Sequence, residues 1–400
     1  MQCQSLFTHI TDEYLAIKRF RSELTEDNLS HITCYYTEEY DFRVIQSAFV
    51  ELFPETTVHG ASSCQAIMTN HGYHKGPVIA ILAIYDSGQH AYGTGISTFE
   101  ANVEASVDAA LNMALVHADR IGEVPNLILL HATPGHEETI IECIDERFGT
   151  LVPIIGGSAA DNNIEGNWSI ITSQGAQQNG VSLTLFYSSQ PVDIAFSAGH
   201  SPTGITGIAT KTKDRILLEI DNKPALDVYR EWTNHQETQS DKESFLFTNS
   251  SAYPLGRIAG HLYERPYYKL SHPIRETKQG GIELFTSIQK GESLTLMQGS
   301  RQHLVARAAR VVNAAFNQKL EESRKIGVIN IFCAGPMLHL KQDINSVCEQ
   351  INQELENLPF ICPFTFGEQG RFIGGENGHG NLMISSAIFH KPYELSLIHI

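Results

Sequence analysis

The chain has 400 residues, of which 42% are hydrophobic and 18% are charged, and this composition indicates a folded protein of two or three domains. The 45 acidic and 28 basic residues give a formal net charge of −17, which argues against nucleic acid or an anionic membrane surface as a partner. No apolar run is long enough to span a bilayer, and the polar N-terminus lacks the apolar stretch of a secretion signal. The seven cysteines form no CxxC pair, which favours reduced thiols and a cytoplasmic protein.

A strand–helix–strand unit, followed by a glycine-rich loop and a further strand, recurs three times along the chain. The predicted elements are strands 32–36, 57–60 and 78–85 with helix 42–53, strands 127–131, 152–156 and 181–187 with helix 137–148, and strands 328–333, 360–366 and 381–389 with helix 341–357. Apolar residues recur every three or four positions in the helices and form nearly continuous runs in the strands. Each unit therefore predicts a parallel strand pair inside a mixed sheet.

Two further segments resemble each other, and each consists of two strands and a helix that lead into the next unit. Their predicted elements are strands 78–85 and 91–96 with helix 101–118, and strands 282–288 and 293–297 with helix 302–319. The repetition favours an α/β fold with mixed sheets, arranged as two related lobes. The polar stretch 234–243 marks a linker or surface loop, so we expect the boundary between Thr210 and Ser240.

The glycine-rich segments Gly60–Ser63 and Gly156–Ser158 match no known phosphate or nucleophile motif. Neither carries the GK[ST] of a phosphate loop, and neither has the closing glycine of G-x-S-x-G. Two interpretations stay open. The serines and backbone amides line a small pocket at the strand ends, or the small residues simply permit a tight turn.

Histidine is abundant, with 18 residues, but the spacing of the histidines gives little support for a catalytic or zinc site. His71 and His74 form an isolated HxxH, which is weak evidence for a metal. His136 precedes Glu137 and Glu138, but the pattern is not HExxH, and acids at the start of a helix are explained by the helix dipole. Without a nucleophile, base and orienting group at recognisable spacing, we expect a binding protein rather than an enzyme.

The segment 364–383, FTFGEQGRFIGGENGHGNLM, combines six glycines with a dense set of polar side chains. Such a mixture favours a ligand site, although a hydrogen-bonded surface loop produces it too. His379 lies in this segment between two glycines, and His200 and His272 lie beside prolines. A neutral imidazole on a restrained backbone suits an axial iron ligand, whereas each alone is more often a satisfied polar residue. Cys362, inside an apolar strand, reads as a core cysteine rather than a thiolate ligand.

Several stretches resemble the paired FIST N and FIST C domains. The stretch 197–233 resembles the region that joins the two domains, and the strings SHP, ELFTSIQKGESLTLMQGS, NIFCAGPM and FTFGEQGRFIGGENGHGNLMISSAIF resemble FIST C. The strings GASS and GGSAADN resemble FIST N. The resemblance covers roughly residues 30–390 and implies a leader at 1–29, a FIST N domain at 30–225, a FIST C domain at 226–390 and a tail at 391–400.

The layout, with no kinase or other output segment, is similar to the stand-alone nitric-oxide-sensing NosP subgroup. That resemblance implies heme as cofactor, nitric oxide as signal and a partner histidine kinase whose regulation influences biofilm formation. Pro336 replaces the second cysteine of the subgroup's CAGCM, which weakens any cysteine-pair chemistry. The candidate iron ligand is His379, then His272, then His200, and the other candidate site residues are Glu368, Arg371 and Asn381. The alternative is a heme-free sensor of an amino acid or other metabolite; a homo-oligomer is possible in either case.

Overall fold

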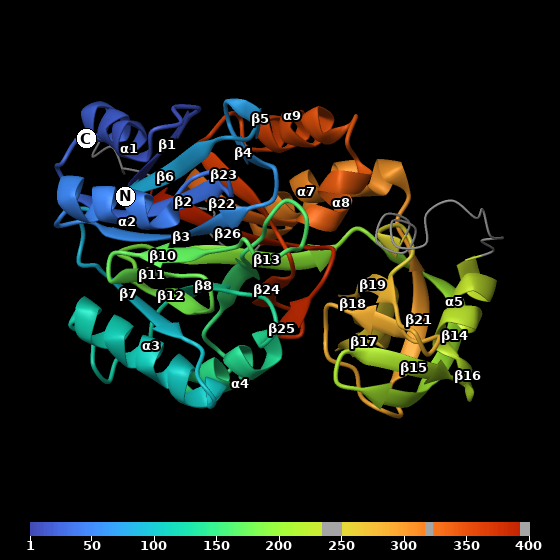
Figure 1. Cartoon of the computed structure of the whole chain (residues 1–400). Helices are drawn as coiled ribbons and strands as arrows, with labels where there is room; N and C mark the ends of the chain where they lie inside the picture. The colour runs from blue at the N-terminus through green and yellow to red at the C-terminus, as the bar shows by residue number, and fades with distance from the viewer. Residues whose placement is uncertain (234–249, 317–322, 393–400) are drawn as a thin grey trace, which may run out of the picture.

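The computed structural model describes residues 1–233, 250–316 and 323–392, and Figure 1 shows the arrangement of their helices and strands. Three units of similar order make up most of the molecule, and a smaller β-rich domain is inserted into the third unit. None of the helices in these ranges has the length and apolar character needed to cross a membrane.

Each of the first two units consists of two strand–helix pairs, a third strand, a hairpin and a closing strand. The elements of the first unit are β1 (Gln2–Thr8), α1 (Glu13–Glu23), β2 (Leu29–Thr37), α2 (Phe42–Leu52), β3 (Thr57–Ser63), β4 (Ala66–Thr69), β5 (Gly72–Lys75) and β6 (Ile79–Tyr85). Those of the second are β7 (Ala91–Thr98), α3 (Val103–Ala118), β8 (Leu127–Ala132), α4 (Glu137–Phe148), β9 (Ile154–Ser158), β10 (Ile170–Thr172), β11 (Gly175–Gln177) and β12 (Gly180–Tyr187).

The third unit repeats this order around the inserted domain. Its elements are β13 (Val192–Ala198), α7 (Arg301–Phe316), β22 (Ser323–Cys333), α8 (Ala334–His339), α9 (Ile344–Glu354), β23 (Phe360–Thr365), β24 (Glu368–Arg371), β25 (Asn377–Gly380) and β26 (Met383–Pro392). The predicted parallel pair is confirmed in every unit, as β2 with β3, β8 with β9 and β22 with β23. The closing strands β6, β12 and β26 are antiparallel to β2, β8 and β22, as a mixed sheet requires.

Short side chains and capping residues explain the local structure. Asp41 accepts a hydrogen bond from the Arg43 amide at the start of α2, and Asn102 accepts one from the Ala105 amide at the start of α3.

Two glycines permit close packing of neighbouring strands. A Cβ on Gly60 would lie 1.9 Å from the carbonyl oxygen of Cys34, and a Cβ on Gly156 would lie 1.9 Å from that of Leu130. Only glycine permits this close approach, so these two glycines serve strand packing.

Hairpins pass between the units in a closed cycle. The glycine-rich loops expected before the closing strands contain the hairpins β4–β5, β10–β11 and β24–β25, whereas Gly60–Ser63 and Gly156–Ser158 lie in β3 and β9. The hairpin of the first unit pairs with β23 of the third, that of the second pairs with β3 of the first, and that of the third pairs with β9 of the second. Each six-stranded sheet is therefore completed by a neighbouring unit.

Residues 1–29, expected to form a leader, contain β1 and α1, and β1 pairs along its length with β6. In the same way β7 pairs with β12 and β13 pairs with β26, so β1 occupies the equivalent edge of the first sheet. The first repeating unit thus begins at the start of the chain. Of the expected tail, the structure describes Lys391 and Pro392, which belong to β26, and residues 393–400 lie outside the described ranges.

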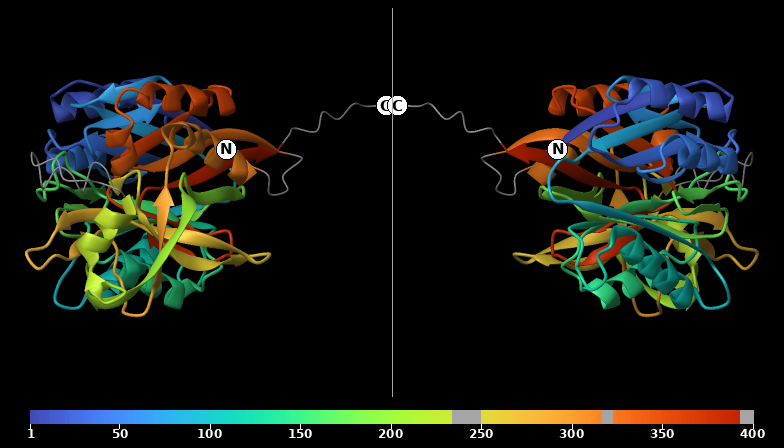
Figure 2. Two further views of the ribbon diagram at one scale, coloured as in Figure 1. Left: turned by 90° about the vertical axis from the view of Figure 1, so that its right-hand side faces the viewer. Right: turned by 90° about the vertical axis from the view of Figure 1, so that its left-hand side faces the viewer.

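The inner faces of the three sheets share one apolar core, to which Tyr35, Leu129 and Ile331 contribute from β2, β8 and β22. The outer faces pack against helices: α1 and α2 on the first sheet, α3 and α4 on the second, α7 and α9 on the third. The side views in Figure 2 show the blue helices α1 and α2 and the teal helices α3 and α4 on opposite sides of the sheets.

The inserted domain lies to one side of the three units (Figure 1). It comprises β14 (Ser201–Lys213), β15 (Ile216–Ile220), β16 (Lys223–Pro224), α5 (Ala225–Thr233), β17 (Leu255–Leu262), β18 (Arg265–Ser271), β19 (Pro273–Glu276), β20 (Ile282–Leu284) and β21 (Ser293–Gln298). These strands form one eight-stranded sheet with an apolar core of its own, against which α5 packs. The boundary expected at 225/226 falls at the start of α5, within this domain, and the expected linker at 234–243 lies outside the described residues.

Candidate functional site

The candidate site lies where the hairpin β24–β25, helix α4 and the inserted domain meet. The hairpin pairs through Glu368 and Gln369 with β9, which places its side chains beside the start of α4. Gln369 and His379 are directly opposite each other across the hairpin. Residues distant in sequence, from the second unit, the third unit and the inserted domain, therefore converge at this junction.

Arg215 joins the inserted domain to two adjacent glutamates at the start of α4. Its Nη2 donates to Glu137 Oε2 at 2.6 Å and to Glu138 Oε2 at 2.9 Å. Its Nη1 donates to the carbonyl oxygen of Phe285 at 2.7 Å, and this bond fixes the guanidinium within its own domain. The Glu137 side chain is only 1% exposed, so this ion pair is largely removed from water.

The electrostatic balance of the glutamate pair favours the ionised carboxylates. Burial opposes ionisation of both groups, but the nearby His379 and Arg215 outweigh it and hold the pKa of Glu137 and of Glu138 below the ordinary value. Glu138 Oε1 also accepts a hydrogen bond from the Ser287 amide at 2.9 Å. Two negative charges thus converge on a single guanidinium nitrogen at the domain junction.

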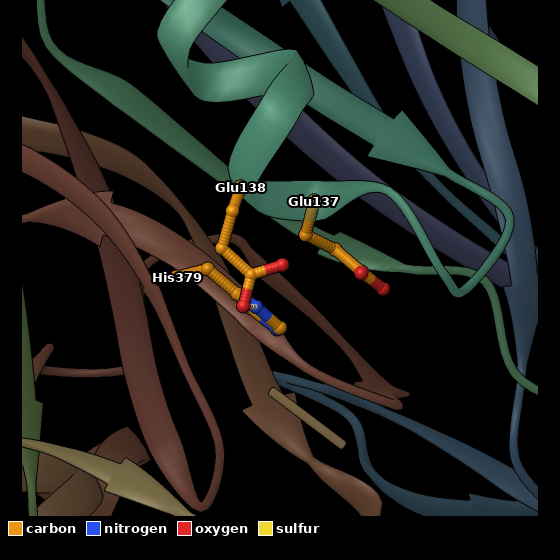
Figure 3. Close-up of side chains that lie close together, drawn as sticks. All are labelled: Glu137, Glu138 and His379. Atoms are coloured by element: carbon orange, nitrogen blue, oxygen red, sulfur yellow. Dashed lines mark ion pairs between the residues drawn. The ribbon is translucent and has the colours of Figure 1, made fainter. Parts of the chain in front are cut away.

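His379 is buried beside this pair, and Figure 3 shows the Glu138 carboxylate reaching from the first turn of α4 to the imidazole. The side chain of His379 is 0% exposed, and its Nδ1 lies 3.3 Å from Glu138 Oε1. Neither ring nitrogen makes a hydrogen bond to any described residue. Because buried polar atoms are normally hydrogen-bonded, an imidazole with an ion-pair contact but no hydrogen bond among the described residues points to a missing partner.

Gln369 and Ser158 extend the polar cluster along β24 and β9. Ser158 Oγ donates to Glu137 Oε1 at 2.7 Å, and Gln369 Nε2 donates to Ser158 Oγ at 3.3 Å. The amide oxygen of Gln369 is buried without a hydrogen-bond partner among the described residues. The Gln369 amide oxygen is therefore a second site in the cluster with a buried polar atom that lacks a hydrogen bond among the described residues, and Gln369 lies opposite His379 on the same hairpin.

Three more of the predicted site residues lie near the same junction. Glu368 is fully buried, and burial raises its pKa to about 8, although hydrogen bonds from Thr365 and from the Met383 amide oppose the shift. Asn381 accepts from the His272 amide at 3.0 Å and so ties the end of the hairpin to the inserted domain. His272 is itself buried, with Nε2 3.4 Å from Ser251 Oγ.

The remaining two predicted residues hydrogen-bond to backbone carbonyl oxygens. Arg371 donates from Nη1 to the Leu151 carbonyl oxygen. His200 donates from Nε2 to the Ser251 carbonyl oxygen at 2.8 Å, and burial lowers its pKa to about 4. The structure thus groups His379, Glu368, Asn381 and His272, and it leaves Arg371 and His200 outside that group.

Other histidines and serines noted in the sequence are satisfied within the fold. His131 donates from Nδ1 to the Gly157 carbonyl oxygen at 2.8 Å, and its Nε2 accepts from Tyr35 Oη at 2.9 Å. His74, in the hairpin β4–β5, stacks on Phe7 with ring centres 3.7 Å apart. Ser62 Oγ accepts a hydrogen bond from the Ser169 amide. Each of these side chains therefore has a contact within the fold.

Heme, which the family resemblance implies, does not fit these histidines in the described arrangement. A Cβ on Gly367 would lie 2.5 Å from His379 Nε2, so the backbone of Gly367 lies against that nitrogen, while Nδ1 faces Glu138. His200 has its Nε2 occupied by a carbonyl oxygen, and the His272 ring packs 5.7 Å from the Phe285 ring centre. A porphyrin at His379 would need the segment around Gly367 to move.

The sequence interpretation missed Glu137, Glu138 and Arg215 as site residues. The two glutamates were visible as adjacent acids at a helix start, which the helix dipole explains without a ligand. Arg215 carried no signal, because it lies in the turn between β14 and β15 of an inserted domain. Only the docking of that domain onto α4 brings the guanidinium to the carboxylates.

Two solved structures, both described as cyanuric acid hydrolases, align with nearly the whole chain. One is 7% identical, covers 97% of this chain and 99% of its own, and has a TM-score of 0.31. The other, from A. caulinodans, is 10% identical, covers 98% and 99%, and has a TM-score of 0.32. At these scores the likeness supports no conclusion about activity. No curated protein matches the chain.

Two family models match adjacent parts of the sequence. The FIST N domain matches residues 30–223, and the FIST C domain matches residues 225–371. The boundary between the two matches falls at β16, inside the inserted domain. FIST domains are sensory domains of signal transduction, which fits a sensory rather than a catalytic protein. The chain therefore belongs to the FIST family.

Proposed function

We propose that this FIST protein is a sensor that binds a small polar metabolite, such as an amino acid, at the junction of β24–β25, α4 and the inserted domain. The observation that carries the proposal is a set of buried polar atoms on facing strands of one hairpin, the Gln369 amide oxygen and the His379 ring nitrogens, which have no hydrogen bond among the described residues. A buried polar atom without a hydrogen bond costs about 1–3 kcal/mol, and a ligand that supplies the partner removes this cost.

The chemistry of the junction suits a zwitterion. The ammonium group of an amino acid complements the carboxylates of Glu137 and Glu138, and its carboxylate complements Arg215. Because Arg215 belongs to the inserted domain and the glutamates to α4, a ligand that enters between them changes how the domain is held. A signalling partner that binds the two arrangements with different affinities therefore responds to the presence of the ligand.

A thermal-shift screen of the heme-free full-length protein against amino acids and related metabolites tests this proposal. A ligand at 100 times its Kd stabilises the protein by about 2.7 kcal/mol, which raises the unfolding midpoint measurably. The shift is expected to vanish in Gln369→Leu and in His379→Ala. It is expected to persist in His303→Ala, which removes an exposed histidine from α7. A shift that survives both site substitutions would place the ligand elsewhere.

A second candidate is heme-based nitric oxide sensing with a histidine kinase as partner. It rests on the resemblance to the NosP subgroup and on the His379 ring nitrogens, which have no hydrogen bond among the described residues, and it requires the segment around Gly367 to move away from Nε2. Absorption spectra of the purified protein before and after hemin, and then nitric oxide, test it. The expected result is a Soret band that shifts on nitric oxide addition and is lost or altered in His379→Ala, or else in His272→Ala or His200→Ala. Absence of any Soret band after hemin would reject this version and leave the metabolite sensor standing.

The kinase partner is tested separately from the ligand. Autophosphorylation of a candidate histidine kinase is measured with and without the full-length protein, in the ligand-free and ligand-bound forms. A sensor with a coupling free energy of about 1–3 kcal/mol changes the partner's response five- to 150-fold. Equal output in all mixtures would remove that kinase as the partner.

A further inference from the structure

Glu137, Glu138 and His379 form a cluster with the composition of a metal site, and this inference goes beyond the metabolite proposed above although both use these side chains. Within residues 1–233, 250–316 and 323–392, they are the one group of three His, Cys, Asp or Glu side chains whose ligand atoms all lie within 4.8 Å of one another. Figure 3 shows their convergence at the start of α4. Two carboxylates and one imidazole form a ligand set that first-row divalent transition metals accept.

His379 provides a second observation beside the two acids. Its side chain is 0% exposed, and neither ring nitrogen has a hydrogen-bond partner among the described residues. Nδ1 lies 3.3 Å from Glu138 Oε1, an ion-pair contact that lacks hydrogen-bond geometry. Two ligands of one tetrahedral zinc ion, each about 2.0–2.2 Å from the metal, lie roughly 3.4 Å apart. The distance between these two atoms therefore matches the edge of a metal coordination sphere.

Arg215 shows that the two carboxylates already converge on one cation. Its Nη2 lies 2.6 Å from Glu137 Oε2 and 2.9 Å from Glu138 Oε2. A metal ion that binds both carboxylates takes over oxygens that now accept hydrogen bonds from Arg215. Metal and guanidinium therefore compete for the same two carboxylates, with Arg215 at Glu138 Oε2 and His379 at Glu138 Oε1.

We propose that Glu137, Glu138 and His379 bind a divalent first-row transition metal, with Zn²⁺ as the test ion, in competition with the Arg215 guanidinium. Mg²⁺ and Ca²⁺ are not expected to bind, because they prefer sites made of oxygen ligands. Since Arg215 anchors the inserted domain to α4, metal binding releases one of the contacts that hold that domain.

The test uses the full-length protein, stripped with EDTA and dialysed, and titrated with Zn²⁺ by calorimetry and with Co²⁺ by visible absorption. The expected result is one bound ion per chain and a d–d spectrum typical of low coordination number. Glu138→Gln and His379→Ala are each expected to weaken binding by at least about 10–100-fold, the loss seen when even outer groups of a metal site are removed. Glu142→Gln and His303→Ala, which change exposed residues, serve as matched controls and keep the wild-type affinity.

The Arg215→Met variant distinguishes a specific metal site from adventitious metal binding. It removes the competing cation and keeps the three ligands, so Zn²⁺ affinity is expected to rise by about tenfold or more, the effect of losing one close charge pair. If His379→Ala fails to fold, Glu138→Gln and Arg215→Met decide the question, since they change affinity in opposite directions. No binding to the wild type, or binding unchanged in these two variants, overturns the metal site. Neither result affects the metabolite screen, which is performed without added metal.

Discussion

Arg215 Nη2 lies 2.6 Å from Glu137 Oε2, and this contact links the turn between β14 and β15 of the inserted domain to the first residue of α4. Glu137 is almost fully buried, whereas the side chain of Arg215 is 22% exposed. The ion pair therefore belongs to the interior of the domain junction, and its loss leaves a buried carboxylate without the guanidinium that pairs with it.

Arg215→Met is expected to destabilise the protein by about 3–5 kcal/mol, because removing one partner of a buried pair leaves an uncompensated buried charge. The matched control is Arg275→Met in the same domain, whose pair with Glu283 is 56% and 36% exposed. Exposed pairs contribute about 0–1 kcal/mol. Urea unfolding at neutral pH measures both variants, and equal midpoints for the two would contradict a junction held by Arg215.

Glu368→Gln is expected to flatten the dependence of stability on pH. Burial raises the pKa of Glu368 to about 8 in the folded protein, above its ordinary 4.5, so the folded state holds the proton more tightly than the unfolded state. The stability from this group is present at pH values below 4.5 and is lost as the pH rises through about 8. Glutamine is neutral throughout and has no such loss.

Chemical denaturation between about pH 5 and pH 8 measures this effect as a difference between variants, so that histidines common to both cancel. Relative to wild type, Glu368→Gln is expected to gain at least about 1.4 kcal/mol across that range, the equivalent of one pKa unit. Glu349→Gln, an exposed change on α9, is the control and follows the wild-type curve. Parallel curves for Glu368→Gln and wild type would show that Glu368 ionises normally.

Gly156→Ala is expected to destabilise the protein by about 3 kcal/mol, the upper end of the usual cost of overpacking. Its Cβ would lie 1.9 Å from the Leu130 carbonyl oxygen, so the strands β8 and β9 would have to separate. Gly175→Ala is the control, because its Cβ would meet only an Ile96 methyl at 3.5 Å, an ordinary contact. Thermal unfolding compares them, and similar midpoints would mean that the strand pair tolerates a side chain.

The cysteines are expected to be unreactive in the native protein. All seven are buried, and burial raises the pKa of Cys348 to about 11 and of Cys64 to about 12, which suppresses the reactive thiolate. Titration with a thiol reagent is expected to label all seven in denaturant and almost none over the same time in buffer. A rapidly labelled native thiol would reveal an opening that exposes it.

Much of the fold could be predicted from local sequence patterns. The three strand–helix–strand units were visible because apolar periodicity and strand composition are local, and the helix predicted at 137–148 is α4, Glu137–Phe148. The segment 364–383 was also identified from its glycines and polar residues. Its ligand-site interpretation remains a proposal, although His379 lies buried at the domain junction.

What the sequence could not reveal depends on contacts between distant residues. The glycine-rich segments read as loops because a short hairpin gains its stability from the strand it pairs with, here β9 for Glu368 and Gln369. The inserted domain was not recognised in the sequence because its strands follow directly on strand β13 of the third unit, so no change in predicted secondary structure marks where the domain begins. Glu137 and Arg215 are 78 residues apart, and only the docked domain makes them partners.

The cyclic exchange of hairpins has a consequence for how the chain reaches its native state. During synthesis, β9 has an open edge until the last part of the chain emerges, because its partner β24 begins at Glu368. An unpaired strand edge invites association with other chains. A version truncated before this hairpin would therefore be prone to aggregate, whereas in the complete protein each unit covers another's vulnerable edge.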